Sequence, residues 1–257
     1  MQLSAATLAL MLVACLAANP SSQKATESTK SVGTRITHYF PVPKEGITIK
    51  GEGSTKLSDV LREFTRVTGQ TLVATHNSEP LLEAVTTGLN QTVNVPAGQV
   101  YSFVEGLLAF HGFLVQPLNT DEPRLLGIAS AQGNDSGTLR TNAIYVPVED
   151  IAAWNDHAAT LITTMITLPH TDVRTLSNSM RTLFSDANTQ QIVPVGNSNS
   201  LMILGRAPFV VSYVSMLQRC DEEARAQAEA EAANPDRQPR EPRPAQEKQK
   251  PAEAKKP

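Results

Sequence analysis

The chain has 257 residues, a formal net charge of -3 at pH 7 and a pI near 6.0. Hydrophobic residues make up 40% of the sequence, and those able to build a core are grouped between about residues 36 and 220. Because this composition supplies no basic face to hold phosphates, nucleic acid is excluded as an expected partner. The composition neither indicates nor excludes an enzyme.

The chain begins with a short apolar segment, residues 3–13, in which only Ser4 and Thr7 are polar. A membrane-spanning helix needs roughly 20 apolar residues, whereas the core of a signal peptide needs only about 7–15. No Lys or Arg precedes this segment, so the charged start of a signal peptide is missing or is supplied by the α-amino group. We expect residues 1–18 to form a signal peptide and the mature chain to be exported.

The apolar segment ends in Leu12-Val13-Ala14-Cys15, which resembles the lipobox of bacterial lipoproteins. The resemblance implies cleavage before Cys15, whose lipid would anchor a periplasmic protein to the outer membrane, each buried CH₂ contributing about 0.8 kcal/mol. Cleavage at Leu16-Ala17-Ala18 is the alternative, and it would leave a freely soluble periplasmic protein. In both cases Cys220 lacks a partner for an internal disulfide, and its state is otherwise open.

The two ends of the mature chain lack the residues of a core. Residues 19–35 are rich in Ser, Thr and Lys and are expected to form a flexible tether. Residues 221–257 contain no Leu, Ile, Val or aromatic residue, so we expect a disordered tail. Residues 222–233 could prolong a helix, but the prolines from Pro235 onward forbid one.

The first expected unit, residues 36–131, alternates strands with amphipathic helices. One helix has an apolar stripe at helical spacing and ends at Gly69, and a second begins at Pro96 and ends at Gly112. The stripe of the first helix consists of Leu57, Val60, Leu61, Phe64 and Val67. The expected strands are residues 47–49, 71–74 and 92–95, followed by a hairpin of residues 113–115 and 125–128.

The second expected unit, residues 161–220, has the order strand, helix, hairpin, helix. Residues 132–160, which begin as a loop by composition, are expected to form a solvated linker anchored by Trp154. We therefore expect an α+β protein of two small domains, each a short sheet with two helices packed on one face. Each domain buries only a modest core and would be marginally stable alone.

No group of residues indicates catalysis or metal binding. Residues 46–51 have the glycine spacing of a phosphate loop, but Glu52 stands where its lysine should be. The five histidines show no zinc-ligand spacing, and no Gly-x-Ser-x-Gly nucleophile motif is present. Glu149, Asp150 and Asp156 flank Trp154 and are interpreted as solvated residues of the linker. We expect no enzymatic activity, no cofactor, no metal and no small-molecule substrate.

Residues 44–220 resemble the periplasmic N-terminal modules of bacterial secretins. Residues 57–73 and 93–113 are similar to the short secretin module that is also found on signalling TonB-dependent receptors. Residues 199–203 are similar to the hairpin of a secretin N-domain of the NolW-like kind, although Val195-Gly196 replaces the acidic residue usual in the family. No strand-rich segment follows Cys220, so the resemblance does not extend to the secretin barrel.

The segment from Ile192 to Gly205, IVPVGNSNSLMILG, has two apolar runs around a polar Gly, Asn and Ser cluster, which predicts a β-hairpin. An Asn can adopt the positive φ that such a turn needs. The candidate residues for this hairpin turn and sheet edge are Asn199, Ser200, Leu201 and Met202.

The resemblance implies a protein-interaction component of a secretin-based type II secretion or type IV pilus-like apparatus. Such a protein would dock on, or co-assemble with, a secretin or inner-membrane assembly proteins, as a homo- or hetero-oligomer. Small sheets with open edges suit this role, because a neighbouring chain can extend them. The alternative is a periplasmic signalling adaptor whose first module relays a state to an inner-membrane regulator. The particular system, the cargo and the oligomer number stay open.

Overall fold

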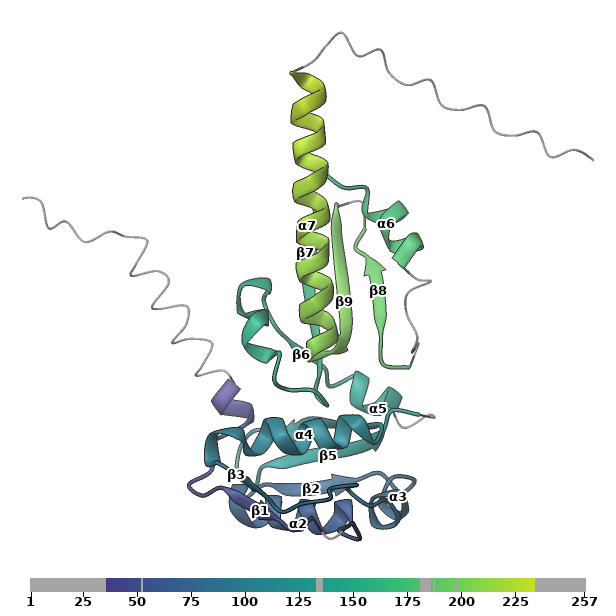
Figure 1. Ribbon diagram of the computed structural model, residues 1–257. Coiled ribbons are helices and arrows are strands. Elements are labelled where there is room, and N and C mark those ends of the chain that lie inside the picture. The colour runs from purple at the N-terminus through teal and green to yellow at the C-terminus, as the bar shows by residue number, and fades with distance from the viewer. Residues whose placement is uncertain are drawn as a thin grey trace, which may run out of the picture.

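The computed structural model describes residues 36–51, 53–132, 136–180, 186, 188–196 and 198–233 (Figure 1). The candidate lipidation residue Cys15, the expected signal peptide and the expected tether at residues 19–35 lie outside the described residues. In chain order the elements are β1 (Ile47–Ile49), α2 (Leu57–Thr68), β2 (Thr71–Ala74), α3 (Glu79–Ala84), β3 (Val93–Val95), η1 (Ala97–Gln99), α4 (Val100–Phe110), β4 (Phe113–Asn119), β5 (Leu125–Ser130), α5 (Ser136–Arg140), β6 (Ile144–Tyr145), η2 (Val148–Trp154), β7 (Leu161–Thr167), α6 (Val173–Met180), β8 (Gln191–Pro194), β9 (Ser200–Arg206) and α7 (Ala207–Ala232).

The strands form three small sheets, which confirms the expected α+β class. The first sheet is β1-β3, the second is β2-β5-β4 and the third is β6-β7-β9-β8. The strands expected to make one sheet in the first module therefore make two, and α2 contacts both of them as well as α4. Helix α3, which the sequence analysis did not predict, has only six residues and is too short to show a clear helical period.

Helix α2 shows how the apolar stripe of the sequence becomes a packed face. Its buried residues Leu57, Val60, Leu61 and Phe64 face the core. The helix ends at Gly69, which has φ 70° and donates its N–H to the carbonyl of Thr65. A residue with a Cβ is strained in this left-handed conformation, so the predicted glycine stop is confirmed.

The segment expected to be a solvated linker, residues 132–160, contains secondary structure where it is described. It forms α5, β6 and η2, and β6 pairs in parallel with β7 in the third sheet. Trp154 is only 2% exposed and packs against Phe40, with 6.3 Å between the ring centroids. The expectation of a solvated segment was wrong because a two-residue strand and a 3₁₀ helix leave no periodic apolar pattern, whereas the expected anchoring by Trp154 is confirmed.

Residues 221–232, which were expected to begin the disordered tail, instead belong to α7, which continues to Ala232 and projects beyond the third sheet (Figure 1); the rest of the expected tail from residue 234 lies outside the described residues. Asp221 is nearly buried and accepts hydrogen bonds from the backbone N–H of His170 at 2.9 Å and the hydroxyl of Thr171 at 2.8 Å. This contact fixes α7 to the loop before α6. Among the described residues, no helix is both long and apolar enough to cross a bilayer.

The two expected modules share one apolar core. The cluster of buried residues includes Leu57, Val104 and Leu126 of the first module and also Ile162 and Leu217 of the second. Neither module is therefore separated from the other by a solvated boundary, although the division of the chain at residues 36–131 and 161–220 stays a prediction.

Candidate protein-interaction surfaces

The predicted hairpin is present as β8 and β9, joined by a tight turn. The N–H of Val195 donates to the carbonyl of Ser200 at 2.9 Å, and the hydroxyl of Ser198 donates to the carbonyl of Val195 at 2.7 Å. The positive φ in this turn, 58°, belongs to Gly196, and no described non-glycine residue has a positive φ. Asn199 therefore does not adopt the conformation that an Asn could take in this turn, whereas Gly196 adopts it without strain, and Asn197 lies outside the described residues.

The expectation that residues 199–202 form a sheet edge is also wrong. Strand β9 lies between β7 and β8, so the edges of the third sheet are β6 and β8. Asn199 accepts the N–H of Leu168 with its carbonyl, and Leu201 is fully buried in the core. The hydroxyl of Ser200 lies 3.0 Å from that of Thr167 across the strand pair. Asn199 and Met202 are exposed, whereas Ser200 and Leu201 are buried, and any role of these residues in binding stays a prediction.

The third sheet has one covered face and one open face. Helix α7 packs on β7 and β9, and α6 packs on β8 and β9, so inward residues such as Ile166 and Ile203 are buried. Side chains alternate between the faces of a sheet, and the outward set contains several large apolar residues. The apolar residues of the open face are Tyr145, Met165, Val193, Met202 and Leu204, and the polar Thr163 and Gln191 lie among them.

The strand register gathers these side chains into a patch. Val193, Met202 and Met165 are cross-strand partners in one row. Tyr145 pairs with Thr163, which in turn pairs with Leu204, and so makes the adjacent row. The exposed fractions of Tyr145, Met165 and Met202 are 59%, 47% and 40%. Apolar side chains grouped on an exposed sheet face mark an interaction surface more often than isolated ones do.

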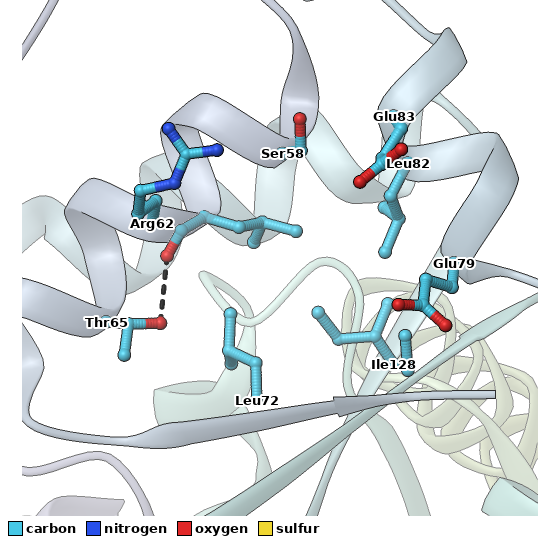
Figure 2. Close-up of a pocket in the computed structure, with 10 residues that line it drawn as sticks. Ser58, Arg62, Thr65, Leu72, Glu79, Leu82, Glu83 and Ile128 are labelled. Carbon is cyan, nitrogen blue, oxygen red and sulfur yellow. Dashed lines mark hydrogen bonds between the residues drawn. The ribbon is translucent and has the colours of Figure 1, made fainter.

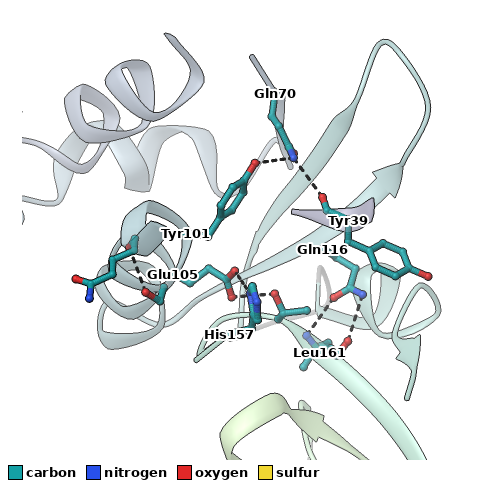
Figure 3. Close-up of polar contacts among 10 residues, drawn as sticks. Tyr39, Gln70, Tyr101, Glu105, Gln116, His157 and Leu161 are labelled. Carbon is teal, nitrogen blue, oxygen red and sulfur yellow. Dashed lines mark hydrogen bonds and ion pairs between the residues drawn. The ribbon is translucent and has the colours of Figure 1, made fainter. Parts of the chain in front are cut away.

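A buried polar cluster joins the two modules (Figure 3). The Nδ1 atom of His157 lies 2.8 Å from a carboxylate oxygen of Glu105, whose other oxygen accepts the hydroxyl of Thr160 at 2.9 Å. The side chains of His157 and Glu105 are 10% and 3% exposed, and the ring of Phe40 stacks on His157 with 4.5 Å between centroids. Because Thr160 donates a hydrogen bond to Glu105 and the cluster is closed to solvent, the cluster acts as a structural tie.

No local sequence pattern reveals this cluster, because its members are distant in the chain. Glu105 and His157 are separated by 52 positions, so no local spacing connects them. The apolar stripe of α4 offers one weak signal, since a carboxylate within such a stripe must find a buried partner.

Two glutamines complete the polar contacts in Figure 3. The Gln116 amide donates to the carbonyl of Leu161 at 3.2 Å and accepts the N–H of Leu161 at 3.1 Å, as a paired strand would. Gln70 donates to the hydroxyl of Tyr101 at 2.8 Å and to the carbonyl of Tyr39 at 3.2 Å. Burial raises the pKa of Tyr101 well above its usual value, and hydrogen bonds to Gln70 and Thr68 only partly oppose this.

Protein-family models and curated proteins include no match to this chain. The chain is similar to a solved structure of the Klebsiella pneumoniae type II secretion system outer membrane complex of PulD, PulS and the PulC HR domain. The identity is 19%, the TM-score is 0.46, and the match covers 66% of this chain but only 26% of that chain.

Two further solved structures are similar to the chain. The enterotoxigenic Escherichia coli GspC–GspD complex matches at 16% identity and a TM-score of 0.24, over 69% of this chain and 99% of that chain. The N-terminal domain of the secretin XcpQ from Pseudomonas aeruginosa matches at 15% identity and a TM-score of 0.23, over 69% and 64% of the two chains. We draw no functional conclusion from matches this distant.

Proposed function

We propose that the protein is a non-enzymatic interaction component of a secretin-based type II secretion or type IV pilus-like apparatus. In this role it docks on a secretin, or co-assembles with one, outside the cytoplasm. The single observation that carries the interaction role is the open face of the third sheet. The link to secretins rests on the order of the sequence motifs within residues 44–220.

The physical chemistry of the open face favours another protein as its partner. Two methionines and a tyrosine offer polarizable, adaptable contact area, and such residues are enriched at interfaces. Covering these side chains would remove apolar surface from water, which stabilises a complex by roughly 25 cal/mol for each Å² buried. The neighbouring strand β8 leaves one side unpaired at the sheet edge, where a second chain can add backbone hydrogen bonds.

Crosslinking in intact cells followed by purification from membranes tests the proposed function. The wild-type protein should recover a secretin or an inner-membrane assembly protein. The double variant Met165→Asp, Met202→Asp should recover about tenfold less, because a carboxylate in an apolar interface loses its hydration. Gln218→Asp, at an exposed position on α7, is the matched control and should recover as much as the wild type.

Two results would contradict the proposed function. One is the recovery of neither class of partner at native expression levels, and the other is equal recovery by the double variant while it remains folded. A purely transcriptional response to disruption of the first module, with secretion intact, would instead support the signalling adaptor. Deleting residues 36–131 is a poorer experiment, because it would uncover the core that the two modules share.

The proposed location is the periplasm, with a lipid on Cys15 as the outer-membrane anchor. This part of the proposal is supported by the lipobox-like sequence alone. Mass spectrometry of the mature N-terminus tests it directly: a diacylglyceryl-modified Cys15 supports anchoring, whereas an N-terminus at or beyond Ala17 supports a freely soluble form.

A further inference from the structure

Strand β2 lies at the edge of the second sheet, and the backbone groups on its unpaired side can be identified. It pairs with β5 on one side only, as the outer member of the second sheet. The N–H of Thr71 donates to the carbonyl of Arg124 at 2.9 Å, and the N–H of Thr75 donates to the carbonyl of Ile128 at 3.0 Å. Because backbone groups alternate in direction along a strand, the N–H groups of Leu72 and Ala74 point away from β5.

A groove of about 300 Å³ lies beside this free edge, between β2, α2 and α3 (Figure 2). Its lining includes Leu72 and Ala74 of the edge strand itself and the buried side chains of Leu61, Leu82 and Ile128. A chain that pairs with the edge would therefore place every second side chain over an apolar floor. Backbone pairing supplies affinity and the groove supplies selectivity in this kind of recognition.

The charges around the groove differ between its two ends. Arg62 of α2 stands at the Leu72 end, and Glu79 and Glu83 of α3 stand at the opposite end (Figure 2). Arg62 is already engaged, since it contacts Asp59 at 3.2 Å. Both carboxylates are exposed and lie one helical turn apart, which favours a cationic side chain between them.

We propose that the β2 edge binds an extended peptide segment of another protein as an added strand. An apolar side chain of the segment fills the groove, and a Lys or Arg of the segment lies between Glu79 and Glu83. This inference goes beyond the proposed function, because it concerns the first module and requires neither the open face of the third sheet nor a secretin.

The experiment uses the full mature chain and a phage-displayed library of random decapeptides. Selection on the wild type is combined with counter-selection on Ala74→Pro, which removes an outward N–H from an edge position where proline is tolerated. Ala74→Ser keeps that N–H and is the matched control. Melting temperatures of both variants confirm that they are folded.

The expected peptides alternate apolar with polar residues and carry a Lys or Arg toward one end. They should bind the wild type and Ala74→Ser equally and Ala74→Pro at least tenfold more weakly. In the saturated complex, amide hydrogen exchange at Leu72 and Ala74 should slow at least tenfold. The double variant Glu79→Gln, Glu83→Gln should weaken binding three- to tenfold at low salt and less at high salt.

The inference is overturned if no selected peptide distinguishes the wild type from Ala74→Pro, or if exchange at Leu72 and Ala74 is unchanged in the complex. It is also overturned if sedimentation shows a dimer that Ala74→Pro abolishes, since a second copy then occupies the edge. If Ala74→Pro does not fold, the exchange measurement and the Gln variants decide. None of these results changes the outcome of the crosslinking experiment on the open face.

Discussion

A few buried polar residues at the junction between the modules stabilise the folded protein. Glu105 is buried together with His157 and Thr160, and both of its carboxylate oxygens are engaged. Removing one member of such a group leaves its partners without hydrogen bonds in a place that water does not reach. The cost of breaking a buried pair is therefore larger than the net benefit of having it.

Glu105→Ala should reduce the free energy of unfolding by about 3 kcal/mol, because it leaves His157 and Thr160 unpaired and creates a cavity. Glu105→Gln keeps the side-chain shape and one acceptor, so it should cost about half as much. Urea denaturation followed by circular dichroism measures both values. The control Glu223→Ala, at an exposed ion pair on α7, should stay within about 0.5 kcal/mol, and a similarly small effect at Glu105 would contradict the structural role.

Tyr101 gives the protein a specific sensitivity to alkaline pH. Its folded-state pKa is raised by burial above the usual value of about 10, so above that pH the unfolded chain binds fewer protons than the folded one. Stability is therefore lost as the pH rises above about 10. Tyr101→Phe should make the decline shallower by up to about 1.4 kcal/mol per pH unit, in denaturation measured from pH 9 to 11. Equal slopes for the two proteins would show that Tyr101 ionises freely.

At the scale of elements, the first half of α7 is held by packing and the second half by the high helix propensity of its Ala, Glu, Gln and Arg residues. Its first half buries Val210, Val214 and Leu217 against the third sheet. Its later turns carry exposed charged pairs such as Arg225 with Glu229, each of which contributes little. Asp221 stands where the buried half ends, and its carboxylate binds the loop at residues 170–171.

Asp221→Ala should reduce stability by about 1–3 kcal/mol and speed amide exchange at His170, because the N–H of that residue loses its acceptor. The far end of α7 should fray independently of this change. Hydrogen exchange measured residue by residue separates the two effects. Glu222→Ala, at the next and exposed position, is the control, and faster exchange there but not in Asp221→Ala would contradict the assignment.

At the scale of the whole molecule, the modules are joined by backbone, polar and apolar contacts together. The N–H of Val115 donates to the carbonyl of Ala159 at 3.0 Å, next to the paired bonds of Gln116 with Leu161. The guanidinium of Arg206 also donates to the carbonyl of Ala109, at 3.2 Å. Because the modules also share a core, neither module can unfold without exposing buried side chains of the other.

We therefore expect the described part of the protein to unfold in one cooperative transition. Trp154 fluorescence reports the junction and far-ultraviolet circular dichroism reports both modules, so the two signals should change at the same urea concentration. In calorimetry the measured and van't Hoff enthalpies should agree. Two separated transitions would show that the modules fold independently.

The candidate surfaces were only partly predictable from the sequence. The hairpin from Ile192 to Gly205 was predicted because an apolar run, a turn cluster and a second apolar run are local features. Whether Met202 would lie at an edge or on an inner strand depends on where β7 pairs, and β7 lies more than thirty positions earlier. Glu105 and His157 were separated too far for any spacing rule to connect them.

The sequence by itself determined the α+β class, the helix ends at Gly69 and Gly112, and the strands of the hairpin. These features depend on local apolar periodicity and on backbone conformations that glycine adopts most easily. Only the tertiary structure decided that α5 packs on the first module while β6 and η2 pack on the second, that the two modules share a core, and that β2 and β6 lie at sheet edges. Such features depend on which distant segments meet, because burial and hydrogen bonding reward contacts that no local pattern records.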